Sequence, residues 1–124
     1  MFAEALNDAD QKRPRLSVRT ASLTLSGSWR GVHPVRRGDT VDLEVELPGT
    51  PRWSDLVGDS RNQGHRGSQA TVRGHIETVD GNVVLARVES ALLQIELLDT
   101  PPIGAAGTEI EIAADDLEFY PTGI

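Results

Sequence analysis

The residue types best suited to chemistry gather in one stretch, residues 58–75, with the sequence GDSRNQGHRGSQATVRGH. A histidine can act as a general acid, a general base or a metal ligand, and an arginine can bind anions. The stretch shows no hydrophobic period before Ala70, so it is either an active site or a connecting loop. It contains, in order, Arg61, His65, Arg66, Arg73 and His75.

A metal site is not expected from these residues. Zinc needs three or four ligands at compatible spacing, and the sequence has no such motif. His65 and His75 stand ten positions apart across a loop-to-strand junction, so the alternative is a pair of solvated histidines. We predict no metal and no cofactor. The possible ligands in the sequence are His33, His65, His75, Asp55 and Asp59.

Catalytic motifs are also missing from the sequence. The nucleophile pattern G-x-S-x-G does not occur, and no strand leads into a helix where it would sit. Asp115 and Asp116 are adjacent, so on a strand they would face opposite sides rather than a shared cleft. The spacing of Gly58, Gly64 and Gly67 fits neither a P-loop nor a dinucleotide fingerprint. We predict that the chain is not an enzyme; an enzyme remains the third alternative, and it would need a pocket with perturbed titratable groups.

The elements that position these residues belong to one small domain. A chain of 124 residues can fold around one core, and it has no cysteine to form disulfides or thiolate sites. The net charge of −7 is unevenly distributed. Residues 1–75 carry eleven Lys or Arg against nine Asp or Glu, whereas residues 76–124 carry one, Arg87, against ten. If the acidic half gathers on one face, it would attract a basic partner and repel phosphate.

The start of the chain, MFAEALNDADQKRPRL, is acidic where a secretory signal is basic and apolar. No later segment approaches about 18 uninterrupted apolar residues, so no membrane span is predicted. We therefore expect a cytoplasmic protein. The helical pattern of residues 2–10 is too short to be stable, which predicts a flexible N-terminal tail over residues 1–15 and a single β-barrel domain over residues 16–124.

Strands dominate the remainder. In TVDLEVEL, Val41, Leu43, Val45 and Leu47 alternate with polar residues, which predicts a strand with one buried face. Asp80, Gly81 and Asn82 predict a hairpin turn. Short strands with Gly and Pro between them favour an all-β fold, a small antiparallel barrel of six or seven strands with a long loop at about residues 48–68. Gly74, inside a strand pattern, is typical of the coiling that closes such a barrel.

The segment VRGHIETVDGNVVLARVESALLQIELLDTPPIGAAGTEIEI resembles OB-like barrels in its order of a glycine-kinked strand, a tight hairpin, a third strand and a glycine-containing connector. It is also similar to TOBE modules, small barrels appended to bacterial transporter ATPases or used to hold oxyanions. The resemblance covers about residues 69–120 and implies an OB-like fold. The segment has no basic oxyanion cluster and no phosphate-binding Gly-Lys-Ser run, so no functional residue follows from the resemblance.

The loop from Arg52 to Ser68 is about 17 residues long, and loops of this length in compact domains are functional or disordered. Disorder is one alternative and a partner-binding loop is the other. Trp53 is either packed at the rim or a binding contact, whereas Trp29 is expected to pack inside the barrel. The candidate binding residues are Arg52, Trp53, Arg61, His65, Arg66 and Arg73.

The leading hypothesis is a non-catalytic module, an adaptor or immunity-type protein, that binds a basic protein with its acidic face and the loop 52–68. The alternative is an OB-type binder of single-stranded nucleic acid or oligosaccharide. Aromatic residues make up only 4% of the chain and its charge is negative, so nucleic acid is disfavoured as a partner. A homodimer formed through an uncovered strand is a further expectation.

Overall fold

The computed structural model describes residues 1–21, 23–57, 71–89 and 91–122. Within this part, nine strands form one continuous sheet and a short helix follows the fourth strand. The elements are β1 (Phe2–Ala5), β2 (Arg15–Arg19), β3 (Thr24–Trp29), β4 (Thr40–Glu46), α1 (Trp53–Val57), β5 (Thr71–Asp80), β6 (Val83–Val88), β7 (Ala91–Glu96), β8 (Glu109–Ala113) and β9 (Leu117–Pro121). No helix among these residues is long and apolar enough to cross a membrane.

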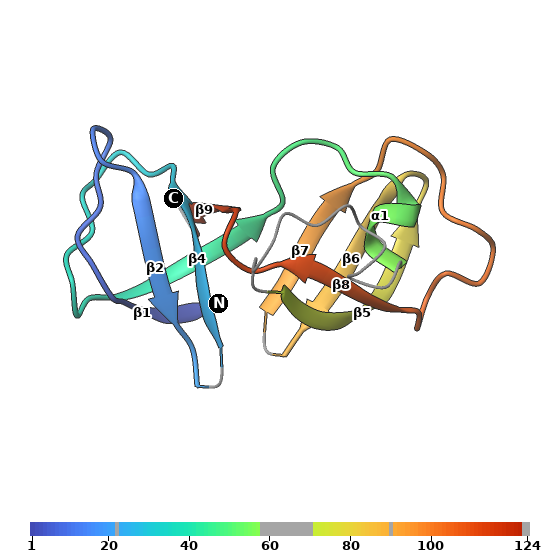
Figure 1. Cartoon of the computed structure of the whole chain (residues 1–124), viewed down its shortest axis with the longest axis horizontal. Helices are drawn as coiled ribbons and strands as arrows, with labels where there is room; N and C mark the ends of the chain where they lie inside the picture. The colour runs from blue at the N-terminus through green and yellow to red at the C-terminus, as the bar shows by residue number, and fades with distance from the viewer. Residues whose placement is uncertain (22, 58–70, 90, 123–124) are drawn as a thin grey trace.

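Five of the strands close into a barrel at one end of the molecule (Figure 1). Their order is β1-β2-β3-β9-β4, and β4 pairs with β1 to complete the ring. The pairing of β3 with β9 is parallel, and the other pairings in the ring are antiparallel. The barrel is thus built from the two ends of the described chain, because β9 inserts between β3 and β4.

The alternation in β4 decides which of its residues face the barrel interior. Leu43 and Val45 are buried, whereas Glu44 between them is exposed. The predicted strand with one buried face is therefore confirmed. Phe119 of β9 is fully buried in the same core, beside the buried residues of β2 and β3.

A glycine permits the parallel contact that closes the barrel. A Cβ atom at Gly27 of β3 would overlap the backbone carbonyl of Leu117 in β9. The register aligns Gly27 with Leu117 and Trp29 with Phe119. Without a side chain at position 27, the two backbones can approach closely enough to pair.

The other strands form a four-stranded antiparallel sheet in the order β7-β6-β5-β8 at the opposite end of the molecule (Figure 1). The turn between β5 and β6 lies where it was predicted, with Gly81 at a φ of 63°. Leu56 of α1 is buried in the core of this region, and α1 contacts β8. A parallel pairing of Glu46 with Gln94 joins β4 to β7, so the barrel and the four-stranded sheet share one core.

The start of the chain differs from the flexible tail predicted for residues 1–15. Residues 2–5 form β1, which pairs with both β2 and β4, and Ala3 and Ala5 are buried. Alanine is too small to produce a clear period of two in hydrophobicity. The segment therefore resembled a weak helix in sequence, although its backbone completes the barrel.

The prediction of an all-β chain with a small barrel is confirmed, although five strands close the barrel instead of six or seven and two of the pairings are parallel. Most of residues 69–120, on which the OB-like resemblance was based, lie in the four-stranded sheet instead of the barrel. Gly74, which was expected to help close the barrel, also lies in the four-stranded sheet. Its missing side chain allows β5 to approach the carbonyl of Arg87 in β6. The long loop predicted at 48–68 contains α1, and residues 58–68 of it lie outside the described part.

Candidate functional site

Trp53 begins α1 and is held by both its backbone and its side chain. Its backbone N–H donates to Oδ1 of Asp99 at 2.8 Å, and its partly buried indole packs against the hydrophobic core. The neighbouring Arg52 is exposed, and its backbone N–H donates to Oδ2 of Asp55 at 2.9 Å. The structure thus shows that Trp53 packs against the core, and a binding contact by this residue stays a prediction.

Arg73 projects from β5, and its side chain is 82% accessible. Its Nε lies 4.0 Å from Oε2 of Glu111 on β8. Val72, the preceding residue, packs against the core, so Arg73 faces the outer side of the sheet, away from the core that Trp53 covers. Arg61, His65 and Arg66 lie outside the described residues.

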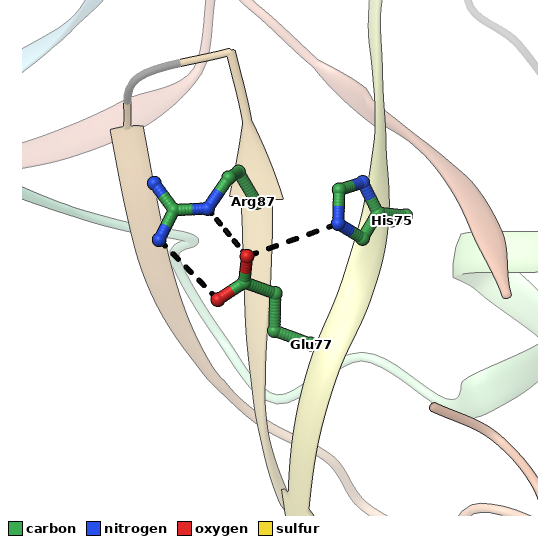
Figure 2. A network of polar contacts seen from close by, with 3 residues as sticks. All are labelled: His75, Glu77 and Arg87. Carbon is green, nitrogen blue, oxygen red and sulfur yellow. Dashed lines mark hydrogen bonds and ion pairs between the residues drawn. The ribbon is translucent and has the colours of Figure 1, made fainter. Parts of the chain in front are cut away.

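His75, which ended the stretch discussed first, belongs to a polar cluster with Glu77 and Arg87 on the outer face of β5 and β6 (Figure 2). Glu77 accepts hydrogen bonds from Arg87 Nε at 2.5 Å and from Arg87 Nη2 at 3.3 Å. The Nε2 atom of His75 lies 3.8 Å from Oε1 of the same carboxylate. The strand register shifts between Ile76 and Thr78, so Glu77 occupies a β-bulge.

The electrostatics of this cluster follow from the bond between Arg87 and Glu77. The hydrogen bond from Arg87 holds the pKa of Glu77 below its ordinary value of 4.5, and the charges of Arg87 and His75 add to that effect. The same hydrogen bond raises the pKa of Arg87. A carboxylate with a lowered pKa is a weak proton acceptor, so Glu77 is better suited to link β5 to β6 than to act as a general base.

A second group of residues covers the outer face of β1, β4 and β9, and we call it the acidic strip. Glu44 lies directly opposite Tyr120, and Glu46 lies directly opposite Glu118. Within the described part, neither Glu44 nor Glu46 forms an ion pair, whereas Glu118 accepts hydrogen bonds from Arg30. The acidic strip consists of Phe2, Asp42, Glu44, Glu46, Glu118 and Tyr120.

Tyr120 reports the electric field at the centre of the acidic strip. Partial burial raises the pKa of its phenol above 10.0, and the charges of Glu118 and Glu46 raise it further, against an opposing effect of Arg30. Two carboxylates, Glu118 and Glu46, thus lie close enough to an aromatic ring on the barrel surface to act on it electrostatically. Carboxylates beside an aromatic face favour the binding of Lys or Arg side chains.

The sequence contained part of the signal for these two groups of residues. The alternation of TVDLEVEL already places Asp42, Glu44 and Glu46 on one wet face, and His75 and Glu77 stand two positions apart on one strand. The partner strand β9 and the bulge at Glu77 leave no local pattern, so Tyr120 and Arg87 were not among the predicted site residues.

Within the described ranges, no group of three or more His, Asp or Glu side chains lies close enough together to hold a metal ion. Trp29 is buried as predicted, and its Nε1 donates to the carbonyl of His33 at 2.8 Å.

No protein-family model matches the sequence, and a search of the curated proteins finds no significant match.

Proposed function

We propose that the chain is a non-catalytic module that binds a basic protein through the acidic strip. The observation that carries the proposal is the position of Tyr120, a half-buried ring on β9 that lies opposite Glu44 and next to the pair formed by Glu46 and Glu118. Burial is the main cause of the raised pKa of its phenol, and the charges of Glu118 and Glu46 add to it. Glu44, directly opposite Tyr120, is exposed and free of ion pairs in the described residues. A partner's Lys or Arg can therefore contact a ring and an unneutralised carboxylate together.

A basic partner can bind the acidic strip without displacing a cation from Glu44 or Glu46 in the described part of the chain. A cation over an aromatic ring gains roughly 0.5–2 kcal/mol, depending on how far it is desolvated. Among the described residues, no cation is paired with Glu44 or Glu46 that would have to be released before they bind an external one. Such charge pairs mainly accelerate association and make it dependent on salt. The proposal rests on the barrel surface and needs no contribution from residues 58–68.

Charge reversal in the acidic strip tests this function. We would measure binding of a Lys- and Arg-rich peptide by calorimetry for the wild type and for Glu44→Lys. Glu109→Lys, at an exposed glutamate of β8, is the matched control because it changes the net charge by the same amount. We expect Glu44→Lys to weaken binding at least tenfold at low salt and the control to change it less than about twofold. Equal losses in both variants, or no binding by the wild type, would show the proposal to be wrong.

We also propose an OB-like classification for the barrel itself. The support is its Greek-key order. Around the ring the strands follow the order β1-β2-β3-β9-β4, and the strands of the four-stranded sheet lie between β4 and β9 along the chain. This is a proposal about fold, and a fold alone does not specify a ligand. An experimental structure in which β3 and β9 were not neighbours would contradict it.

A further inference from the structure

Two loops meet on the side of the barrel that faces away from the four-stranded sheet (Figure 1). One loop, residues 6–14, connects β1 to β2, and the other, residues 30–39, connects β3 to β4. Ala9 and Val35 join them through two backbone hydrogen bonds of 2.9 Å, one in each direction. The loops therefore form one hydrogen-bonded surface instead of two independent tips.

The first loop carries Lys12 and Arg13 on a turn that Asp10 holds. Oδ1 of Asp10 accepts the backbone N–H of Lys12 at 2.9 Å and that of Arg13 at 2.8 Å. These two backbone bonds are the main cause of the lowered pKa of Asp10. The carboxylate thus binds the backbone of the two basic residues, and their exposed side chains form no ion pair within the described residues.

The second loop repeats this arrangement with Arg36 and Arg37. Oδ2 of Asp39 accepts the backbone N–H of Arg36 at 2.9 Å, and Oδ1 of Asp8 accepts the backbone N–H of Arg37 at 2.8 Å. The bond from Arg37 to Asp8 also crosses from one loop to the other. Both arginine side chains are exposed, and neither forms an ion pair in the part of the chain that the structure describes.

We propose that this basic platform, formed by Lys12, Arg13, Arg36 and Arg37, binds the phosphate backbone of a nucleic acid without reading its sequence. Lys and Arg contacts to phosphate position a protein but carry no base information. Because aspartates already order the backbone beneath the four side chains, less conformational entropy is lost on binding.

The net charge of −7 does not prevent this contact. At an ionic strength of 0.1 M, exposed charges more than about 10 Å apart are largely screened, so a bound strand responds mainly to the charges nearest to it. These are the four cations and the carboxylates of Asp8, Asp10 and Asp39, which leave the two loops with one net positive charge among these groups. An anionic membrane would normally require apolar anchors beside the cations. Val32 is the one large hydrophobic residue that is exposed in residues 6–14 and 30–39, which favours nucleic acid over a membrane.

The test replaces the four side chains and keeps the backbone. Lys12→Gln, Arg13→Gln, Arg36→Gln and Arg37→Gln, combined in one variant, retain every N–H that an aspartate holds. We would measure binding of fluorescent single-stranded and duplex oligonucleotides by anisotropy over a range of salt concentrations. The wild type should bind both with dissociation constants of about 10⁻⁴–10⁻⁶ M, and the variant should bind at least tenfold more weakly at low salt. For the duplex, the slope of log K against log salt should fall by up to about 0.9 for each cation removed.

The control is Arg52→Gln combined with Arg73→Gln, two exposed arginines outside the platform, and it removes as many positive charges as a variant of one loop alone. The control should bind oligonucleotides within about twofold of the wild type. Two half variants, one for each loop, should each lose about half of the salt slope, and they keep the test usable if the fourfold variant is unstable in thermal unfolding. Binding of the basic peptide should be retained in the platform variants, because the acidic strip is intact, so failure of this inference is distinguishable from failure of the proposed function.

Three results would overturn the inference. The first is no oligonucleotide binding by the wild type at low salt. The second is an equal loss of affinity in the half variants and in the control, which would indicate a general effect of charge because all of them remove two cations. The third is binding to phosphatidylserine vesicles by a wild type that does not bind oligonucleotides, which would assign the platform to a membrane surface.

Discussion

Gly27 of β3 lies directly against the carbonyl group of Leu117 in β9, at the one parallel pairing of the barrel ring. The contact joins residues that are far apart in the chain, and it brings β9 between β3 and β4. The ring of the barrel therefore depends on the absence of a single side chain.

We predict that Gly27→Ala destabilises the protein by about 2 kcal/mol, because a methyl group would force the two backbones apart. The measurement is urea unfolding followed by circular dichroism. Ser28→Ala, at the next residue of the same strand, is the control and should change the free energy of unfolding by less than about 0.5 kcal/mol. Equal stability of Gly27→Ala and the wild type would show that β3 and β9 are not this close.

The two phenylalanines of the chain should respond in opposite ways to truncation. Phe119 is fully buried, whereas Phe2 is 71% exposed. Phe119→Ala should cost about 3–5 kcal/mol, because it leaves a cavity in the core, and Phe2→Ala should cost less than about 0.5 kcal/mol. Thermal unfolding of the two variants tests both values, and a similar loss in both would contradict the position of β9 inside the barrel.

Acid should weaken the link between β5 and β6. The pKa of Glu77 is lower in the folded protein than its ordinary value of 4.5, so its stabilising contribution is complete above that value. The contribution is lost as the pH falls through the folded pKa. The melting temperature of Glu77→Gln should therefore fall less steeply between neutral pH and acid than that of the wild type. Parallel curves for the two proteins would exclude a role for Glu77 in acid stability.

Tyr120 is the only tyrosine of the sequence, so tyrosinate absorbance reports this residue alone. Its titration midpoint in the folded protein should lie above 10.0, because burial and the charges of Glu118 and Glu46 oppose ionisation. Glu46→Gln should move the midpoint downward, toward the ordinary value. The urea-unfolded chain is the reference, and an identical midpoint in folded and unfolded protein would remove the field on which the acidic strip is argued.

Several features could be predicted because they depend on neighbouring residues alone. The alternation around Leu43 and Val45 and the turn at Gly81 are local patterns, and the structure has both where they were predicted.

The candidate site was less predictable. The sequence indicates Arg52, Trp53 and Arg73 because they flank or belong to a long polar stretch. The structure adds that Trp53 packs on the core and that Arg73 lies on the outer face of β5, and a binding role for the three residues stays a prediction. The basic platform was hidden, since Lys12 and Arg13 lay in what was taken for a flexible tail. Their arrangement depends on the bridge between Ala9 and Val35, which joins two loops that are well separated in sequence.

The sequence by itself determined the class of fold, the wet face of β4 and the position of the turn between β5 and β6, because each follows from a period of two or from the conformational freedom of a few adjacent residues. The tertiary structure alone decided that β9 enters the barrel, that Tyr120 faces Glu44, and that Arg37 binds Asp8 across two loops. These relationships join distant residues. They are selected by closure of the barrel and by the shared core, which compensate the entropy lost when long loops close.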